Sequence, residues 1–352
     1  MTKRRLPLRH VKGASHGRQA KHGYERIQRG RRVLAHLPFV RFSFRFIAVV
    51  FLFTLAILTI RLISQSDWNG RDRITFTLQD FSESQVGGEV FLVSYLPPEG
   101  LSVVVLPATL QIETIGGFGL WKAGSVYQLG ELEGRGGALL SGTLAEFFGV
   151  NVDGWVVSPE KVQLSSDTLK TSLKTSLMRT LFGRGRSNLG VWDLFRLWFS
   201  LGKVRLSQAT LVDLSTASVL REETLPDGST TYRTDPERLD QLARRLFALP
   251  EITREGLSVS VLNATGHPRL GNRAARAIEN SGGDVVSIAD FRTLEEQTTI
   301  VVSSDSLREY ATVGVLRKFF ASERVSVGET ASARADILLV VGEDYFRKLS
   351  EF

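Results

Sequence analysis

The sequence predicts an α/β protein with three structured parts: an N-terminal transmembrane helix, an α/β domain and a small mixed α/β sandwich domain. Three observations predict it. An unbroken apolar run of 15 residues lies at 46–60, strand-like and helix-like segments alternate over 72–250, and a second compact set of strands and helices fills 256–350. The length of 352 residues is enough for about two folded domains in addition to the helix.

Composition and charge exclude several kinds of chemistry. The chain has no cysteine, so disulfides, thiolate catalysis and cysteine metal sites are excluded. Its net charge of +7 is unevenly divided, because residues 1–45 hold 13 Lys and Arg and a single acid, Glu25, which leaves −5 for the rest. The positive charge therefore belongs to the tail, and it does not predict a nucleic-acid-binding domain.

The apolar run 46–60 is the predicted membrane anchor. Extended over its apolar flanks it reaches about 20 residues, the span of a bilayer core, and Arg45 and Arg61 at its ends can reach the headgroups. A buried core helix would have a polar side, which this run lacks. A cleaved signal peptide would be followed by a small-x-small site, but "RLISQSDWNG" follows. We therefore expect an uncleaved transmembrane helix at 41–64.

The charge on the two sides of this run predicts the topology. Basic residues crowd the N-terminal side, so residues 1–40 are expected to be a disordered cytoplasmic tail, and residues after about 65 to be extracytoplasmic. The predicted location is the cell membrane, in a single pass. The tail is expected to set this topology and to attract anionic lipid, with nucleic-acid binding as the alternative role.

The middle segment, 72–250, predicts an α/β domain. Strands are expected at 72–80, 88–96 and 101–107, a helix at 134–149 ended by Gly149, a strand at 150–160 and two further helices at 187–205 and 235–250. Ser187 or Asn188 is the expected N-cap of the first of these two helices. Asp235 is the expected N-cap of the second, with Pro236 in its first turn.

This segment resembles a divergent LytR-CpsA-Psr domain. The resemblance rests on "LPPEG", on "WKAGSVYQLGELEGRGGALLSGTLAEFFGVNVDGWVV" and on "LPDGSTTYRTDPERLDQLARRLF", in that order along the chain. It implies a bacterial, membrane-anchored, extracytoplasmic protein of the cell envelope. Active members of the family transfer glycopolymers from polyprenyl-pyrophosphate carriers onto peptidoglycan, with arginines, aspartates and Mg²⁺ around the pyrophosphate.

The sequence departs from the family at the residues that hold the pyrophosphate. The family's third strand ends in Ile-Pro-Arg-Asp, whereas this chain reads Leu-Pro-Ala-Thr, with Ala108 and Thr109 in the two charged places. The aspartate before the second strand falls near Gly88 or Glu89, and no arginine adjoins it. A Mg²⁺-pyrophosphate needs carboxylates and guanidinium groups. We therefore assign no catalytic residue, metal ligand or cofactor. Mg²⁺ is expected only for a transferase with a rebuilt site, which would also need a lipid-sized apolar cavity behind Leu-Pro-Ala-Thr.

A second basic segment, "RGRSN", precedes the helix expected at 187–205. Arg184 and Arg186 fall roughly where the family has another arginine cluster. They are either part of a solvated basic loop or candidates for binding the phosphate of a lipid carrier.

The C-terminal segment predicts the mixed α/β sandwich. Strands are expected at 257–263, 284–290, 298–304, 325–328 and 335–342, and helices at 269–283, 305–321 and 343–349, the middle one capped by Asp305. The order of elements resembles the LytR C-terminal domain over 257–349, most specifically in "VLNATG" and "ARADILLVVGEDY". Because that module is found appended to envelope proteins, the resemblance implies binding or scaffolding outside the membrane.

The turn after the first strand of this segment has the layout of a phosphate-binding loop. Gly266 and Gly271 have the glycine spacing of a P-loop, but Asn272-Arg273 replaces the Lys-Ser/Thr pair, so phosphates and Mg²⁺ have no dedicated ligands. We interpret Asn263, Gly266 and Gly271 as residues that shape the turn and the helix start. Arg269 and Arg273 remain candidates for anion binding at the helix N-terminus.

These inferences predict a non-catalytic envelope protein that binds or organises cell-wall polymers or their processing proteins. An active glycopolymer transferase with a rebuilt site is the alternative, and a transmembrane regulator with a nucleic-acid-binding tail is a second. Expected partners are the membrane, cell-wall polymer or polyprenyl-phosphate lipid, and envelope proteins, with nucleic acid disfavoured.

Overall fold

The computed structural model describes residues 38–64, 66–80, 88–162, 164–224, 228, 230–329 and 335–350. The chain divides into two compact units, 1–61 and 62–352, and each is described by itself. Residues 1–37 lie outside the described part, so the cytoplasmic tail and its nucleic-acid-binding alternative stay predictions.

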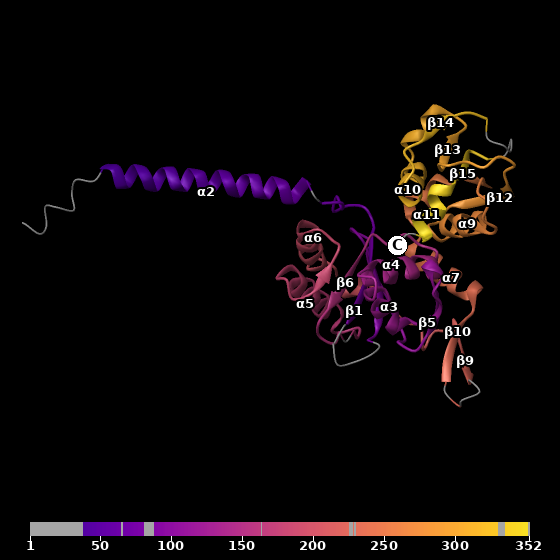
Figure 1. Ribbon diagram of the computed structural model, residues 1–352, viewed down its shortest axis with the longest axis horizontal. Helices are drawn as coiled ribbons and strands as arrows, with labels where there is room; N and C mark the ends of the chain where they lie inside the picture. The colour runs from indigo at the N-terminus through magenta and orange to yellow at the C-terminus, as the bar shows by residue number, and fades with distance from the viewer. Residues whose placement is uncertain are drawn as a thin grey trace, which may run out of the picture. The chain divides into compact units, whose positions relative to one another are not determined.

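The first long helix, α2, runs over Pro38–Ser64 and covers the predicted span at 41–64 (Figure 1). Large apolar side chains on all sides of α2 are exposed to solvent, namely Phe46, Ile47, Val49, Val50, Phe51, Leu52, Phe53, Leu55 and Ile57. In the part of the chain that the structure describes, no helix combines the length and apolarity that crossing a bilayer requires. The predicted transmembrane helix is thus not found there.

The middle domain is built on a six-stranded sheet with the order β7-β6-β1-β2-β3-β8. The neighbours β1 and β2, β2 and β3, and β6 and β7 are antiparallel, whereas β1 and β6, and β3 and β8, are parallel. The strands are β1 (Ile74–Asp80), β2 (Val90–Leu96), β3 (Gly100–Leu106), β6 (Gly154–Ser158), β7 (Arg186–Ser187) and β8 (Ala209–Asp213).

Helices cover both faces of this sheet, because its inner strands are apolar on both sides. Val90 and Leu92 of β2 pack with α3 (Val126–Glu131), α4 (Gly136–Phe148) and α7 (Pro236–Phe247). Phe91 and Val93 pack on the other face with α5 (Leu169–Leu181) and α6 (Val191–Leu201). Figure 1 shows α5 and α6 side by side. The result is a three-layer α/β domain, which agrees with the predicted fold class.

Several smaller elements were not predicted. The helix α5 was missed, as were two hairpins, β4 (Gln111–Thr114) with β5 (Gly119–Lys122), and β9 (Leu220–Thr224) with β10 (Thr230–Thr234). The predicted cap of α6 is wrong, because α6 begins after Gly190 and has no side-chain cap. Asp235 does cap α7 by accepting a hydrogen bond from the Arg238 backbone N–H, and Gly149 ends α4 in the left-handed conformation. A short helix, α8 (Pro250–Glu255), follows α7.

The C-terminal domain has a five-stranded mixed sheet with the order β12-β11-β15-β13-β14. Alternate residues of its central strands, such as Val261, Leu339 and Ile300, form one core with the helices on a single face. The elements are β11 (Ser258–Asn263), α9 (Leu270–Asn280), β12 (Asp284–Asp290), β13 (Thr299–Val302), α10 (Ala311–Phe320), β14 (Val325–Val327), β15 (Ile337–Val341) and α11 (Glu343–Ser350). This is the predicted mixed α/β sandwich.

The helix expected at 305–321 is broken in two. A 3₁₀ helix covers Asp305–Glu309 after Ser304, Tyr310 is extended, and α10 begins only at Ala311. The cause is remote in sequence: the Glu255 carboxylate of α8 accepts the backbone N–H groups of Ala311 and Thr312, at 2.7 and 2.8 Å. These are first-turn donors that a helix leaves unpaired, so a distant carboxylate fixes the helix start.

The packing of α4 on β6 yields a first prediction. A Cβ added to Gly137 would lie 2.1 Å from the indole ring of Trp155, so Gly137→Ala should force the helix off the strand. We expect a loss of about 1–3 kcal/mol in the free energy of unfolding, measured by urea titration.

The matched control is Gly314→Ala in α10, where no atom lies within 4 Å of the added Cβ. Here alanine is the better helix former, so a small gain of about 0.5–1 kcal/mol is expected. An equal loss in both variants would show that the close approach at Gly137 is not what matters.

Candidate functional site

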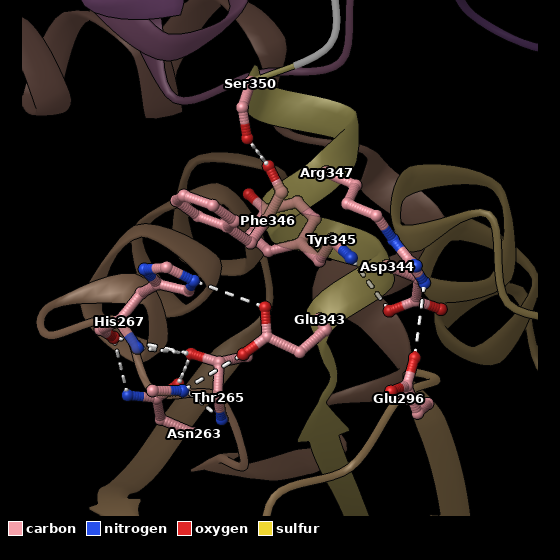
Figure 2. A network of polar contacts seen from close by, with 11 residues as sticks. Asn263, Thr265, His267, Glu296, Glu343, Asp344, Tyr345, Phe346, Arg347 and Ser350 are labelled. Carbon is pink, nitrogen blue, oxygen red and sulfur yellow. Dashed lines mark hydrogen bonds and ion pairs between the residues drawn. The ribbon is translucent and has the colours of Figure 1, made fainter.

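The turn between β11 and α9 is held by its own polar groups. The buried Asn263 amide donates to the His267 carbonyl and to the Asp290 carboxylate, at 3.1 and 3.0 Å, and its oxygen accepts the Thr265 hydroxyl at 2.7 Å. Figure 2 shows Asn263, Thr265 and His267 of this network. Every hydrogen-bonding atom of the Asn263 side chain is therefore used inside the fold.

The carboxylate of Glu343, from α11, contacts the same turn. Glu343, the first residue of α11, accepts the Gly266 backbone N–H at 3.1 Å and pairs with His267 Nε2 at 3.2 Å (Figure 2). The His267 ring stacks on Phe346 of the same helix. An external anion at this place would have to displace Glu343. The contacts of Glu343 with Gly266 and His267 instead hold α11 against the turn that precedes α9.

The predicted glycines of this turn differ in what they do. A Cβ on Gly271 would approach Asn263 Cβ and Ile288 Cγ2 at 3.2 and 3.3 Å, so glycine lets α9 lie close to the sheet. Gly266 has open space around it. The residue with left-handed φ in the turn is Arg269, at +65°, directly before α9, and no sequence signal marked it.

The structure separates the two arginines predicted near this helix start. Arg269 is exposed, whereas Arg273 Nε pairs with the Glu146 carboxylate of α4 at 3.0 Å. These two guanidinium groups therefore do not converge on one anion.

The side chains beyond Arg273 on α9 bind the C-terminal end of α4. Arg276 donates to the carbonyls of Glu146 and Phe147 at 2.6 and 2.8 Å and pairs with Asp240 of α7 at 2.7 Å. The fully buried Asn280 donates to the Phe148 carbonyl at 2.8 Å. These are carbonyls that a helix end leaves without intrahelical partners. Sequence reasoning missed both residues, since a helix pattern does not show what faces it.

Two clefts flank this contact. One, of about 240 Å³, is lined by α4, α9 and α11 and includes Ser141, Asn151 and Lys348, whose pKa is lowered by the crowding of protein around its ammonium group. The other, of about 520 Å³, is lined in part by Arg73 and Lys318. Arg73 donates to the carbonyl of Leu246, in the last turn of α7, and to that of Ala248, just after it. Burial lowers the pKa of Arg73 to about 10, opposed by Glu99 and Glu251.

The turn after β3, where the family has its charged pair, is neutral, with Ala108 half-buried and Thr109 exposed. Ala108 accepts the Gly124 backbone N–H at 3.1 Å. Leu110 follows directly and is fully buried, together with Tyr127 and Leu139 from α3 and α4. Leu110 therefore belongs to the apolar core beneath this turn.

An acidic pair lies near that turn, at the end of β1. Asp80 is buried, its Oδ2 accepts the Val162 backbone N–H at 3.3 Å, and its Oδ1 has no hydrogen-bond partner in the described part of the chain. Burial raises the pKa of Asp80, opposed by nearby backbone N–H groups and by Lys161. Burial and the charge of Asp80 also raise the pKa of Glu89. Within the described ranges, no group of three or more His, Asp or Glu could hold a metal ion.

The predicted basic residues before α6 lie on the edge strand β7 and beside it. Arg186 pairs with Glu131 at 2.6 Å, and its side chain is 69% exposed. Arg184 is exposed and forms no ion pair with a described carboxylate. The structure therefore brings neither arginine to the acidic pair.

Comparison with known proteins identifies the C-terminal domain. Residues 256–345 match the family model described as LytR cell envelope-related transcriptional attenuator, which confirms the LytR C-terminal domain predicted from the sequence. No curated protein matches the chain.

Three solved structures have similar folds over about half of this chain. They are the transcriptional regulator yvhJ from Bacillus subtilis (9% identity, 49% of this chain and 94% of that one, TM-score 0.38), TagT bound to LI-WTA (13%, 51% and 92%, 0.40) and B. subtilis TagT (14%, 51% and 91%, 0.35). TagT and yvhJ are LytR-CpsA-Psr proteins, the family that residues 72–250 resemble. At these TM-scores the likeness carries no argument about what this chain does.

The contact between α9 and α4 leads to the second prediction. Asn280→Ala should lower the free energy of unfolding by about 1–3 kcal/mol, because it leaves the buried Phe148 carbonyl without a donor. Thermal and urea unfolding would measure the loss.

The control is Asn272→Ala, on the exposed side of the same helix, where a change within about 0.5 kcal/mol is expected. If Asn280→Ala behaves like Asn272→Ala, the amide is not what binds the two helices.

The raised pKa of Asp80 gives the third prediction. An acid whose pKa is higher in the folded state favours the fold when protonated, so its ionisation should cost stability as the pH rises from the unfolded pKa through the raised one. In Asp80→Asn this part of the pH dependence should vanish. Unfolding of both proteins between pH 3 and pH 8, roughly the range in which carboxyls titrate, would reveal it. Parallel stability curves would contradict the assignment to Asp80.

Proposed function

We propose that this chain is a membrane-anchored, extracytoplasmic protein of the cell envelope that binds or organises wall polymers, or the proteins that process them, without catalysing a transfer. The identity of residues 256–345 as a LytR C-terminal domain supports a place in the envelope. The composition of the chain agrees with the non-catalytic part of the proposal. Because the sequence has no cysteine, neither domain can use a thiol as a nucleophile.

The observation that carries the non-catalytic proposal is the neutral turn after β3. Ala108 and Thr109 supply no charge there, and Leu110 behind them is fully buried. Transfer of a pyrophosphate-linked glycan needs cations for the phosphate oxygens and carboxylates for the metal. The acidic pair Asp80 and Glu89 has one described cation acting on both, Lys161, and no arginine among its described electrostatic partners.

Anchoring by residues 41–64 is part of the proposal. It is supported by the apolar run at 46–60 and by the exposed apolar side chains around α2, which water solvates poorly. The positive charge before the run supports a cytoplasmic N-terminus.

The alternative is a transferase with a rebuilt site, and one observation favours it. Asp80 and Glu89 lie together at one end of the inner strands β1 and β2 with raised pKa values, and carboxyls with perturbed pKa values gather at functional sites. In that case Asp80 would be the residue on which the reaction depends.

A fourth prediction separates the two functions. The full chain in detergent is incubated with a polyprenyl-pyrophosphate-linked glycan and Mg²⁺, and released lipid phosphate is measured. We expect no release above a protein-free background, because the turn after β3 supplies no cation for the phosphate oxygens. Release that Asp80→Asn abolishes would overturn the non-catalytic proposal.

Binding is measured with the same preparation. The full chain should sediment with purified wall sacculi and remain in solution with sacculi stripped of their anionic polymer. Failure to sediment with either would remove wall polymers from the proposal and leave envelope proteins as the partner.

A further inference from the structure

The helix α6 carries an aromatic face that the fold leaves exposed. Its inner side, including Leu194 and Leu197, is buried against the sheet. On the outer side Val191, Phe195 and Phe199 recur every four residues with 51, 40 and 52% of their surfaces exposed. We call the aromatic face the set Val191, Trp192, Phe195, Trp198 and Phe199.

The rings of the aromatic face form a row. The rings of Trp192 and Phe195 stack at 5.5 Å, and those of Phe195 and Trp198 at 6.2 Å, with interplanar angles of 26 and 27°. Each end of the row bears cations: Arg196 lies over Trp192, Lys174 over Trp198 and Lys203 over Phe199, at 5.4, 4.5 and 4.5 Å. The apolar surface is thus bordered by positive charge.

The segment around the aromatic face is the most basic part of the folded chain. Residues 169–205 hold eight Lys and Arg and one acid, Asp193, so they carry +7. Asp193 is buried and accepts the Ser66 hydroxyl and the Trp68 backbone N–H. Among the described residues, only Arg179 and Arg186 of this segment pair with carboxylates, those of Glu160 and Glu131. No described carboxylate pairs with the other six cations, although Lys170 donates to the Gly202 and Val204 carbonyls and Arg196 to the Trp68 carbonyl.

The segment Ser66–Trp68 is hydrogen-bonded to α6. The α2 helix ends at Ser64, and two residues later Ser66 donates to Asp193 on the first turn of α6. Arg196, one turn further, donates to the Trp68 carbonyl at 2.6 Å. The segment Ser66–Trp68 is therefore fixed on the first two turns of α6.

We propose that the aromatic face docks onto a bilayer surface that contains anionic lipid. Exposed aromatic rings favour the interface between headgroups and acyl chains, and lysine and arginine beside them meet the lipid phosphates. The argument from rings and charge does not depend on the proposed membrane anchor.

The same observations disfavour two other occupants. A soluble anionic wall polymer would satisfy the cations but would leave the rings of Phe195 and Phe199 in water. A second copy of the chain would bring two segments of +7 together, which is repulsive.

The fifth prediction tests docking with the full chain in vesicles of phosphatidylcholine and phosphatidylglycerol whose acyl chains are brominated near the headgroup. Tryptophan fluorescence should be quenched, and Trp192→Phe with Trp198→Phe should remove most of that quenching. Phe195→Ser with Phe199→Ser should reduce it at least twofold, since the face then lacks its exposed rings. The control, Leu120→Ser with Leu132→Ser, changes residues that are 66 and 84% exposed in the same domain and should leave quenching unchanged.

The failure of docking and the failure of the anchor give different results. Extraction of the full chain from the vesicles by alkaline carbonate would show that α2 does not anchor it. Docking would then be tested by adding the full chain to the outside of the same vesicles and measuring its binding. Equal quenching in the Phe195/Phe199 variant and the control variant would overturn docking even if the chain stays anchored. Ring-dependent binding to a soluble anionic polymer, without quenching by lipid, would also overturn it.

Discussion

The end of α4 is the constraint on which the two folded domains depend. The carbonyls of Glu146, Phe147 and Phe148 need donors, and the next turn, led by Gly149 in the left-handed conformation, satisfies only part of that need. Arg276 and Asn280 of α9 supply the rest. A positive guanidinium at the C-terminal end of a helix is also favoured by the helix dipole. The contact thus stabilises α4 and fixes α9 at the same time.

The turn before α9 makes this contact specific. Asn263 and Thr265 close the turn, Glu343 ties it to α11, and Gly271 lets α9 approach the sheet closely. Each of these interactions limits where α9 can lie, and hence where Arg276 reaches. A layout that resembles a phosphate-binding loop here serves to position a helix, because a carboxylate of the same domain takes the place of the anion.

Local signals predict the elements of this fold better than the contacts between them. The strands β1, β2, β3 and β6, the strands of the C-terminal sheet, the capping of α7 by Asp235 and the end of α4 at Gly149 follow from short stretches of sequence, whereas β7 and β8 do not. The break at Tyr310 could not be predicted, because it depends on Glu255, about 55 residues away. The same holds for Arg273, whose partner Glu146 belongs to the other domain. The helix α5 was missed because its many Ser, Thr and Lys residues weaken its apolar pattern.

The basic side chains of this chain differ in what the fold requires of them. Arg73 and Arg276 are held at helix ends by carbonyls, and removing either would leave acceptors unsatisfied. Lys174 and Lys203 instead lie over rings of the aromatic face, within a segment of +7 on a chain whose part after residue 45 carries −5. Like charges crowded on one surface repel each other and destabilise a compact state. Because the fold itself gains little from that arrangement, we infer that a partner outside the chain compensates the repulsion. A surface that is both anionic and apolar matches the cations and the rings together.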